Sequence, residues 1–230
     1  MTATYEDTKE QLLEAILNHV PFDGWSETSF RAAISDCDLE PALARAICPR
    51  GAVDLALAFH ARGDAAMLER LKSEDLSGLK FREKIAATVR FRLQAVEDKE
   101  AVRRGMTLFA LPIHAADGAK AVWGTCDQIW TALGDTSDDV NWYTKRATLS
   151  GVYSSTLLYW LGDDSPDYQA TWEFLDRRIE GVMQFEKFKA QVNGNPLLKP
   201  FLAVPNWLAG LVKAPTKLPD NLPGSLSSGK

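Results

Sequence analysis

The first candidates for acid–base or metal chemistry are the three histidines, His19, His60 and His114. None of them has a glutamate three or four residues before it. Both the zinc motif HExxH and the ExxH pair of a di-iron helical bundle need such a glutamate. The glycine-rich phosphate motifs and the GxSxG nucleophile motif are absent as well. We therefore expect a protein that is not an enzyme and that uses neither a metal nor a cofactor.

Two groups of aspartates are the next candidates for chemistry. Each group lies in a turn directly before an expected helix, where carboxylates accept hydrogen bonds from free backbone N–H groups and complement the helix dipole. We interpret both groups as helix-start signals rather than as catalytic pairs. They consist of Asp135, Asp138 and Asp139 in the first turn and of Asp163, Asp164 and Asp167 in the second.

The negative charge of the chain is concentrated at its N-terminus. Residues 1–50 hold nine acids and four bases, a net charge of −5, whereas residues 51–230 hold twenty-two of each. An acidic surface repels a phosphate backbone, so we expect no binding to nucleic acid. The first residues do not resemble a signal or transit peptide, and three scattered cysteines fit a reducing compartment. We expect a cytoplasmic protein.

Apolar residues recur at helical spacing along the chain, and no stretch alternates as a strand would. The N-terminal order is a helix, a turn at Gly24, two short helices and a longer one, which is the layout of a helix-turn-helix head, although any small helical bundle can share it. Ser26 or Thr28 can cap the helix after the turn, and Ser137 can cap a later one. The sequence therefore predicts an all-α, TetR-repressor-like helical bundle with an N-terminal helix-turn-helix-like head and no sheet.

The chain divides into four expected parts. Residues 1–75 form the helix-turn-helix-like head, and residues 76–190 form a helical ligand-binding and dimerisation domain. Within the latter we expect helices over 79–96, 101–115, 118–134 and 138–161, and one that starts at Ser165-Pro166-Asp167 and ends near residue 189. Residues 191–213 form an amphipathic apolar segment, and residues 214–230 form a disordered tail rich in Pro, Gly and Ser.

The apolar segment carries a single helical stripe, because its large apolar residues are spaced four, three, four and three apart. It is too short to span a bilayer, but it could lie in the membrane interface with its tryptophan at headgroup depth. The alternative is a helix that docks on the body of the protein. The expected membrane-interface residues are Leu197, Phe201, Val204, Trp207, Leu208 and Leu211.

The most distinctive part of the sequence is residues 127–178 and their immediate neighbours. They include N-W-Y-T-K-R-A-T-L-x-x-V-Y-x-x-T-x-L-Y and then D-x-S-P-D-Y-x-x-T-W-x-F-L-x-R-R-I. This region resembles the ubiquinone (coenzyme Q) biosynthesis accessory-protein family, the ninth eukaryotic coenzyme Q biosynthesis protein and its alphaproteobacterial relatives. The resemblance implies a TetR-like fold, a homodimer, a lipid-binding apolar cavity and assistance to the demethoxyubiquinone hydroxylase, a membrane-associated di-iron enzyme.

The same resemblance implies a partner-binding surface, which maps onto Asp127, Ile129, Trp142, Tyr143 and Arg146. Trp, Tyr and Arg often contribute most of the binding energy of protein interfaces. Alternatively, Trp142 is a core residue and Arg146 pairs with a nearby aspartate, Asp138 or Asp139.

An excess of aromatic residues is compatible with the implied cavity, although such residues also build ordinary cores. The expected lipid-binding residues are Phe91, Phe109, Trp123 and Trp130. Small residues at 147, 150, 151, 154 and 155 would allow helices to approach closely, either between subunits of a homodimer or within one subunit.

These features lead to one main hypothesis on function. The protein is a non-catalytic, lipid-binding accessory protein of ubiquinone biosynthesis, which binds an isoprenoid quinone intermediate or a phospholipid and presents the substrate to the hydroxylase. It would associate peripherally with a bacterial inner membrane. One alternative is a TetR-type, ligand-responsive transcriptional regulator, and another is an enzyme of quinone synthesis.

Overall fold

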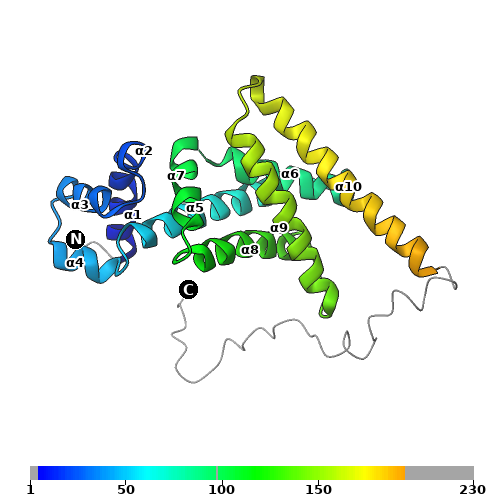
Figure 1. The fold of residues 1–230 in the computed structure, drawn as a ribbon, viewed down its shortest axis with the longest axis horizontal. Helices are drawn as coiled ribbons and strands as arrows, with labels where there is room; N and C mark the ends of the chain where they lie inside the picture. The colour runs from blue at the N-terminus through cyan, green and yellow to red at the C-terminus, as the bar shows by residue number, and fades with distance from the viewer. Residues whose placement is uncertain (1–4, 97, 195–230) are drawn as a thin grey trace.

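The computed structural model describes residues 5–96 and 98–194, with side chains up to residue 184. Within these ranges the chain is helical and contains no strand, which confirms the all-α fold class (Figure 1). The elements are α1 (Tyr5–Leu17), α2 (Val20–Asp23), α3 (Glu27–Asp36), α4 (Pro41–Ile47), α5 (Ala52–Ser73), α6 (Phe81–Gln94), α7 (Lys99–Ala110), α8 (Ala115–Ala132), α9 (Val140–Leu161), the 3-10 turn η1 (Pro166–Tyr168) and α10 (Gln169–Gly194).

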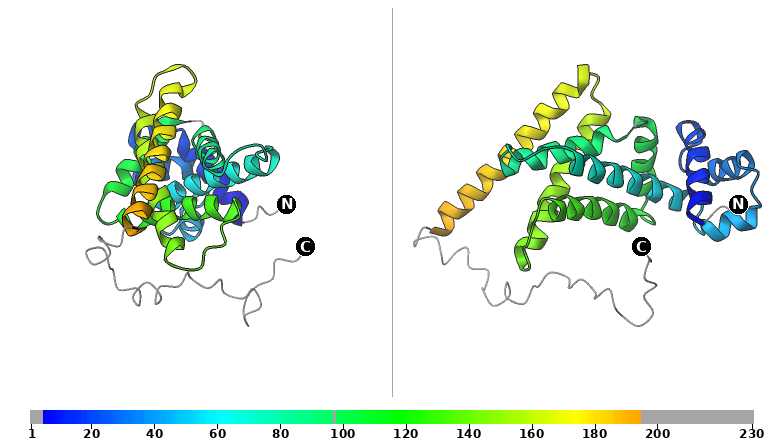
Figure 2. Two further views of the ribbon diagram at one scale, coloured as in Figure 1. Left: turned by 90° about the vertical axis from the view of Figure 1, so that its right-hand side faces the viewer. Right: turned by 180° about the vertical axis from the view of Figure 1, so that it is seen from behind.

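The helices are arranged along an elongated body. Helices α1 to α4 gather at one end, and α5 leads from that end into the larger group formed by α6 to α10 (Figure 1). Helices α9 and α10 run in opposite directions and form a long hairpin at the far side of the body (Figure 2). Helix α5 therefore joins the two ends of the molecule.

Two hydrophobic clusters form the core. The first holds side chains of α1 to α4 and the start of α5, such as Leu12, Phe30 and Leu55. The second joins the end of α5 to α6, α8, α9 and α10, and it includes Met67 and Trp160. Since one helix contributes to both clusters, the expected boundary near residue 75 stays a prediction.

Local signals in the sequence set several helix starts, among them those of α3 and α9. The side chain of Ser26 accepts a hydrogen bond from Ser29 N at 3.2 Å, which confirms Ser26 as the cap of α3. The expected cap at Ser137 is wrong, because the Ser137 hydroxyl donates instead to Asp135 Oδ1 at 2.8 Å. Asp139 caps α9 by accepting from Asn141 N at 2.8 Å.

The last helix begins later than expected. Ser165 precedes a short 3-10 turn rather than an α-helix, and α10 starts only at Gln169. Asp167 and Tyr168 have φ angles of 52° and 57°, which a continuous helix cannot contain. This backbone turn places the Tyr168 ring 5.9 Å from the Trp160 ring and 4.0 Å from Lys99 Nζ.

Candidate functional site

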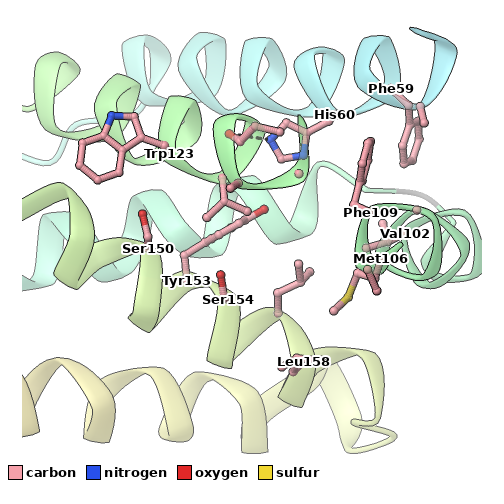
Figure 3. Close-up of a pocket in the computed structure, with 18 of the residues that line it drawn as sticks. Phe59, His60, Val102, Met106, Phe109, Trp123, Ser150, Tyr153, Ser154 and Leu158 are labelled. Atoms are coloured by element: carbon pink, nitrogen blue, oxygen red, sulfur yellow. Dashed lines mark hydrogen bonds between the residues drawn. The ribbon is translucent and has the colours of Figure 1, made fainter. Parts of the chain in front are cut away.

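A cavity of about 720 Å³ lies among α5, α7, α8 and α9. Its walls are mainly apolar, and Figure 3 shows several of the lining side chains directed into it. The volume falls within the range of about 300–1,000 Å³ typical of small-molecule sites. Large apolar side chains in the lining include Trp25, Phe59, Val102, Met106, Phe109, Val122, Trp123, Leu157 and Leu158.

Helical spacing explains why α7 and α9 both face the cavity. Val102, Met106 and Phe109 follow one another at intervals of four and three residues on α7, so they share one face. Helix α9 presents small residues to the same space, among them Ser150 and Gly151. Most of the small residues that we expected at a helix–helix contact thus line the cavity and leave space for it. The expected homodimer stays a prediction.

A buried ionic network forms part of the wall. Arg92 on α6 and Asp64 on α5 are each only 4% exposed, and Arg92 Nε donates to Asp64 Oδ1 at 2.5 Å. Arg92 Nη2 also donates to the backbone oxygen of His60 at 3.0 Å. The Thr125 hydroxyl donates to Asp64 at 3.0 Å. The buried charges therefore neutralise each other instead of facing the cavity unpaired.

His60 completes this network in its neutral form. Its Nε2 lies 2.8 Å from Thr125 Oγ1 and 3.2 Å from the Ala121 oxygen, so we assign the proton to Nε2. Nδ1 then accepts from Arg92 Nη2, which lies 3.3 Å away. Burial lowers the pKa of His60, against the opposing effect of the Asp64 carboxylate, and the Arg92 charge lowers it further.

Gly63 makes room for the Arg92 side chain. A Cβ atom at Gly63 would lie 2.7 Å from Arg92 Cζ, closer than side chains tolerate. A glycine in the middle of a helix costs about 1 kcal/mol relative to alanine, so its presence there has a steric reason. The close approach of Arg92 to α5 supplies that reason.

An aromatic patch, which we define as Trp123, Trp142 and Tyr143, adjoins the cavity. The Trp123 ring lies 5.9 Å from the Trp142 ring and 6.4 Å from the Tyr143 ring, and Trp142 and Tyr143 meet edge to face at 4.8 Å. Trp123 also lines the cavity. One ring therefore connects the interior space to the patch.

A buried arginine, Arg146, packs against the aromatic patch. It is 2% exposed and lies with Cζ 4.0 Å from the centre of the Trp142 ring. Arg146 donates to Asp127 Oδ1 at 2.5 Å and to Asp135 Oδ2 at 2.9 Å. Burial alone would raise the pKa of Asp135, but hydrogen bonds from Lys145, Ser137 and Arg146 hold that pKa well below its usual range. Asp135 is thus an ion-pair residue and not the helix-start residue that we expected.

The five expected partner-binding residues separate into two layers. Trp142 and Tyr143 are partly exposed, and the Asp127 side chain is 42% exposed. Ile129 has no exposed surface and Arg146 has almost none, so the placement of these two on a contact surface is corrected. Ile129 belongs to the second hydrophobic cluster, and Arg146 is drawn inward by two carboxylates. Neither carboxylate belongs to Asp138 or Asp139, the partners weighed in the alternative.

The four expected lipid-binding residues also separate. Phe109 and Trp123 line the cavity. Trp130 lines a different groove, where its ring lies 5.5 Å from that of Phe81. Phe91 is buried beneath Arg70, whose Cζ lies 4.2 Å from the ring centre, so Phe91 is corrected to a core residue.

Sequence reasoning missed the polar side of the cavity. His60 and Asp64 are four residues apart on α5 and therefore share one helix face, and Gly63 lies between them. This combination could have indicated that a side chain from another helix packs closely against that face. Arg92 and Tyr153 carried no such local signal.

The expected membrane-interface residues Leu197, Phe201, Val204, Trp207, Leu208 and Leu211 lie outside the described residues, as does the expected tail. In the described part of the chain, no helix combines the length and the apolar character needed to cross a bilayer.

The fold and the cavity define an all-helical, TetR-like protein with an apolar space inside its helical body. The fold is similar to that of a TetR transcriptional regulator from Nitrosomonas europaea, with a TM-score of 0.63 and 18% sequence identity. The similarity covers 77% of this chain and 98% of the regulator. At this identity the likeness concerns the fold alone, and it confirms the TetR-like architecture.

Sequence comparisons show which family the chain is similar to. A family model described as COQ9 matches residues 115–186, which comprise α8, α9 and much of α10. The chain is 34% identical over 187 residues to the ubiquinone biosynthesis protein COQ9-A, mitochondrial, of Xenopus laevis, with 77% of this chain and 58% of that protein covered. It is 30% identical over 196 residues to the ubiquinone biosynthesis protein COQ9, mitochondrial, of Homo sapiens, with 81% and 61% covered. The chain is therefore similar to proteins of the COQ9 family, as the resemblance predicted.

The relatives differ from this chain in extent and in the compartment that we expected. The chain spans about three fifths of the length of the two COQ9 proteins. Both are named as mitochondrial, whereas the sequence led us to expect a bacterial inner membrane. The location of this chain stays a prediction.

Proposed function

We propose that this protein is a non-catalytic, lipid-binding accessory protein of ubiquinone biosynthesis. In this role it binds an isoprenoid quinone intermediate, or another lipid, in the apolar cavity and presents it to a demethoxyubiquinone hydroxylase. The role in ubiquinone biosynthesis is supported by the names of the COQ9 relatives. Lipid binding is supported by one observation above all, the apolar cavity of about 720 Å³.

The cavity would lower the cost of removing an apolar chain from a membrane. Each methylene group moved from hydrocarbon into water costs about 0.8 kcal/mol, so a long polyprenyl chain cannot travel through water unaided. Side chains such as Val102, Met106 and Leu157 offer the chain an apolar lining instead. The protein would therefore act by solvation and positioning, and the hydroxylase would perform the chemistry.

The position of Trp123 supports presentation to a partner. Trp123 lines the cavity and packs against Trp142 and Tyr143, so a partner bound on the aromatic patch would sit beside the bound lipid. Aromatic residues of this kind are common binding hot spots. We propose that the aromatic patch, together with the exposed carboxylate of Asp127, contacts the hydroxylase.

The regulator alternative has less support than the accessory role. The short helix α4 stands where a repressor would place its recognition helix, and it carries a single cation, Arg45. Arg45 Nη2 donates to Glu27 Oε1 at 2.6 Å, and this carboxylate competes with any phosphate. A DNA-shift assay at low salt tests this alternative, and we expect no shift.

The central test is native mass spectrometry of the protein purified from its host. We expect isoprenoid quinones or other lipids to be retained by the wild-type chain. Gly151 lines the cavity, and a Cβ atom there meets nothing within 4 Å, so we expect Gly151→Phe to add its ring at the cavity and reduce the space for a ligand. Gly181→Phe is the matched control, because Gly181 is also helical and open but lies away from the cavity.

The result that supports the proposal is lipid on the wild-type chain and on Gly181→Phe, with little or none on Gly151→Phe. A lipid-free wild-type chain would contradict it, and so would equal lipid retention by both variants.

A further inference from the structure

Tyr153 brings a polar group, its hydroxyl, into the lining of the cavity. Tyr153 is 1% exposed, yet its hydroxyl makes no hydrogen bond with any residue that the structure describes. Figure 3 shows Tyr153 reaching from α9, and His60 from α5, into the same space. Because this hydroxyl is open to the cavity and no described residue accepts its hydrogen, a molecule bound in the cavity can form a hydrogen bond with it.

We propose that the Tyr153 hydroxyl is the head-group donor of the cavity, and that it selects amphiphiles whose polar end carries a neutral oxygen acceptor such as a quinone carbonyl. This inference rests on the proposed function, because it assumes that the cavity holds the apolar chain of the same ligand. It adds the chemical class of the head and the residue that recognises it.

The neighbouring ionic network explains why the donor role falls to Tyr153. The His60 Nε2–H group is occupied by Thr125 and Ala121, and Thr125 in turn donates to Asp64. Arg92 donates to Asp64 and to His60. These groups satisfy one another, whereas the phenol of Tyr153 can still donate to a ligand.

The same network argues for a neutral head rather than a carboxylate or a phosphate. The Arg92 guanidinium is paired with the Asp64 carboxylate at 2.5 Å, so its charge is not available to bind an anionic head group. Burial raises the pKa of Tyr153, which keeps its hydroxyl protonated and able to donate. Moving an anion into an apolar space without a counter-charge is far more costly than moving a carbonyl.

The test compares two ligands of equal chain length on the full protein by isothermal titration calorimetry. One is a benzoquinone that carries a decyl chain, and the other is decylbenzene, which lacks the carbonyl oxygens. We expect the wild-type chain to bind the quinone about tenfold more tightly than the hydrocarbon, the effect of one buried hydrogen bond.

Tyr153→Phe should remove this preference and leave decylbenzene binding unchanged, because it deletes one oxygen atom and no observed hydrogen bond. Tyr159→Phe is the matched control. Tyr159 lies on the same helix, is exposed, and stacks on Phe174 at 4.5 Å outside the cavity lining. This variant should keep the tenfold preference.

The outcomes separate this inference from the proposed function. If the wild-type chain binds both ligands equally, or if Tyr153→Phe keeps the preference, the head-group role is overturned and the lipid site stands. Tighter binding of decanoic acid than of the quinone would overturn the neutral head. If the wild-type chain binds neither decyl ligand, the lipid site itself fails and this inference with it.

Discussion

Two arginines are buried in the part of the chain that the structure describes, and their surroundings differ in an instructive way. Arg92 pairs with Asp64, which is as buried as Arg92 itself, and Gly63 leaves space for the guanidinium. Arg146 pairs with Asp135 and with Asp127, whose side chain is 42% exposed. The first network is closed and forms part of the cavity wall with its charges paired. The second reaches the surface and holds Trp142 in the aromatic patch.

The comparison teaches that a buried charge can support either an interior space or an external surface, and that its carboxylate partners decide which. A buried carboxylate holds its arginine in the core, whereas an exposed carboxylate extends the ionic network to the protein surface. Four substitutions or conditions can break or sharpen this distinction, from the largest expected effect to the smallest.

Replacement of each arginine by methionine should give the largest effects. Arg92→Met leaves Asp64 buried without a cation on either side, and breaking such a pair costs about 3–5 kcal/mol of unfolding free energy. Arg146→Met should cost less, because Lys145 Nζ still contacts Asp135 Oδ1 at 2.7 Å. Urea denaturation measures both, with the exposed Arg177→Met as control. An equal or larger loss for Arg146→Met would contradict the distinction.

Gly63→Ala should destabilise the protein by up to about 3 kcal/mol, a cost typical of overpacking. The added Cβ atom would displace Arg92 from its place against α5. Gly124→Ala is the matched control, since a Cβ at Gly124 meets nothing within 4 Å and alanine favours the helix. Thermal unfolding should show opposite signs for the two variants. Similar melting temperatures would mean that the Gly63 position tolerates a side chain.

Trp142→Ala should weaken binding to the hydroxylase by about 2 kcal/mol, or roughly thirtyfold in Kd, if the aromatic patch contains an interface hot spot. Tyr159→Ala removes an exposed ring from the same helix, away from the patch, and should leave Kd unchanged. Surface plasmon resonance with the purified hydroxylase measures both. Equal affinities of the two variants would remove Trp142 from the interface.

The smallest expected effect is on how folding stability depends on pH, and it comes from His60. Burial lowers the pKa of His60 in the folded protein, so the unfolded chain takes up the proton more readily as the pH falls. Folding stability from this group is therefore complete above the unfolded pKa of about 6.5 and is lost below it. Urea midpoints between pH 7.5 and 5.5 should fall less steeply for His60→Gln than for the wild-type chain. Parallel slopes would argue against a buried neutral His60.

The sequence was informative where function depends on local pattern. Helical spacing and the cap at Ser26 predicted the all-α fold, and the motif around Trp142 predicted the family. It was less informative where side chains from distant helices meet. Arg92 and Asp64 are twenty-eight residues apart, so their pairing left no local trace. The inward direction of Ile129 and Arg146 likewise follows from packing against other helices, which a list of family positions does not contain.

Photo-crosslinking with a lipid that carries a diazirine on its alkyl chain tests the central claim most directly, because it reports which residues touch the bound chain. We predict labels on cavity residues of α7 and α9, such as Met106, Phe109 and Leu157, with labelling abolished by Gly151→Phe. Labels confined to exposed apolar residues such as Phe22 and Ile113, and unaffected by that substitution, would show that the lipid binds the surface and not the cavity.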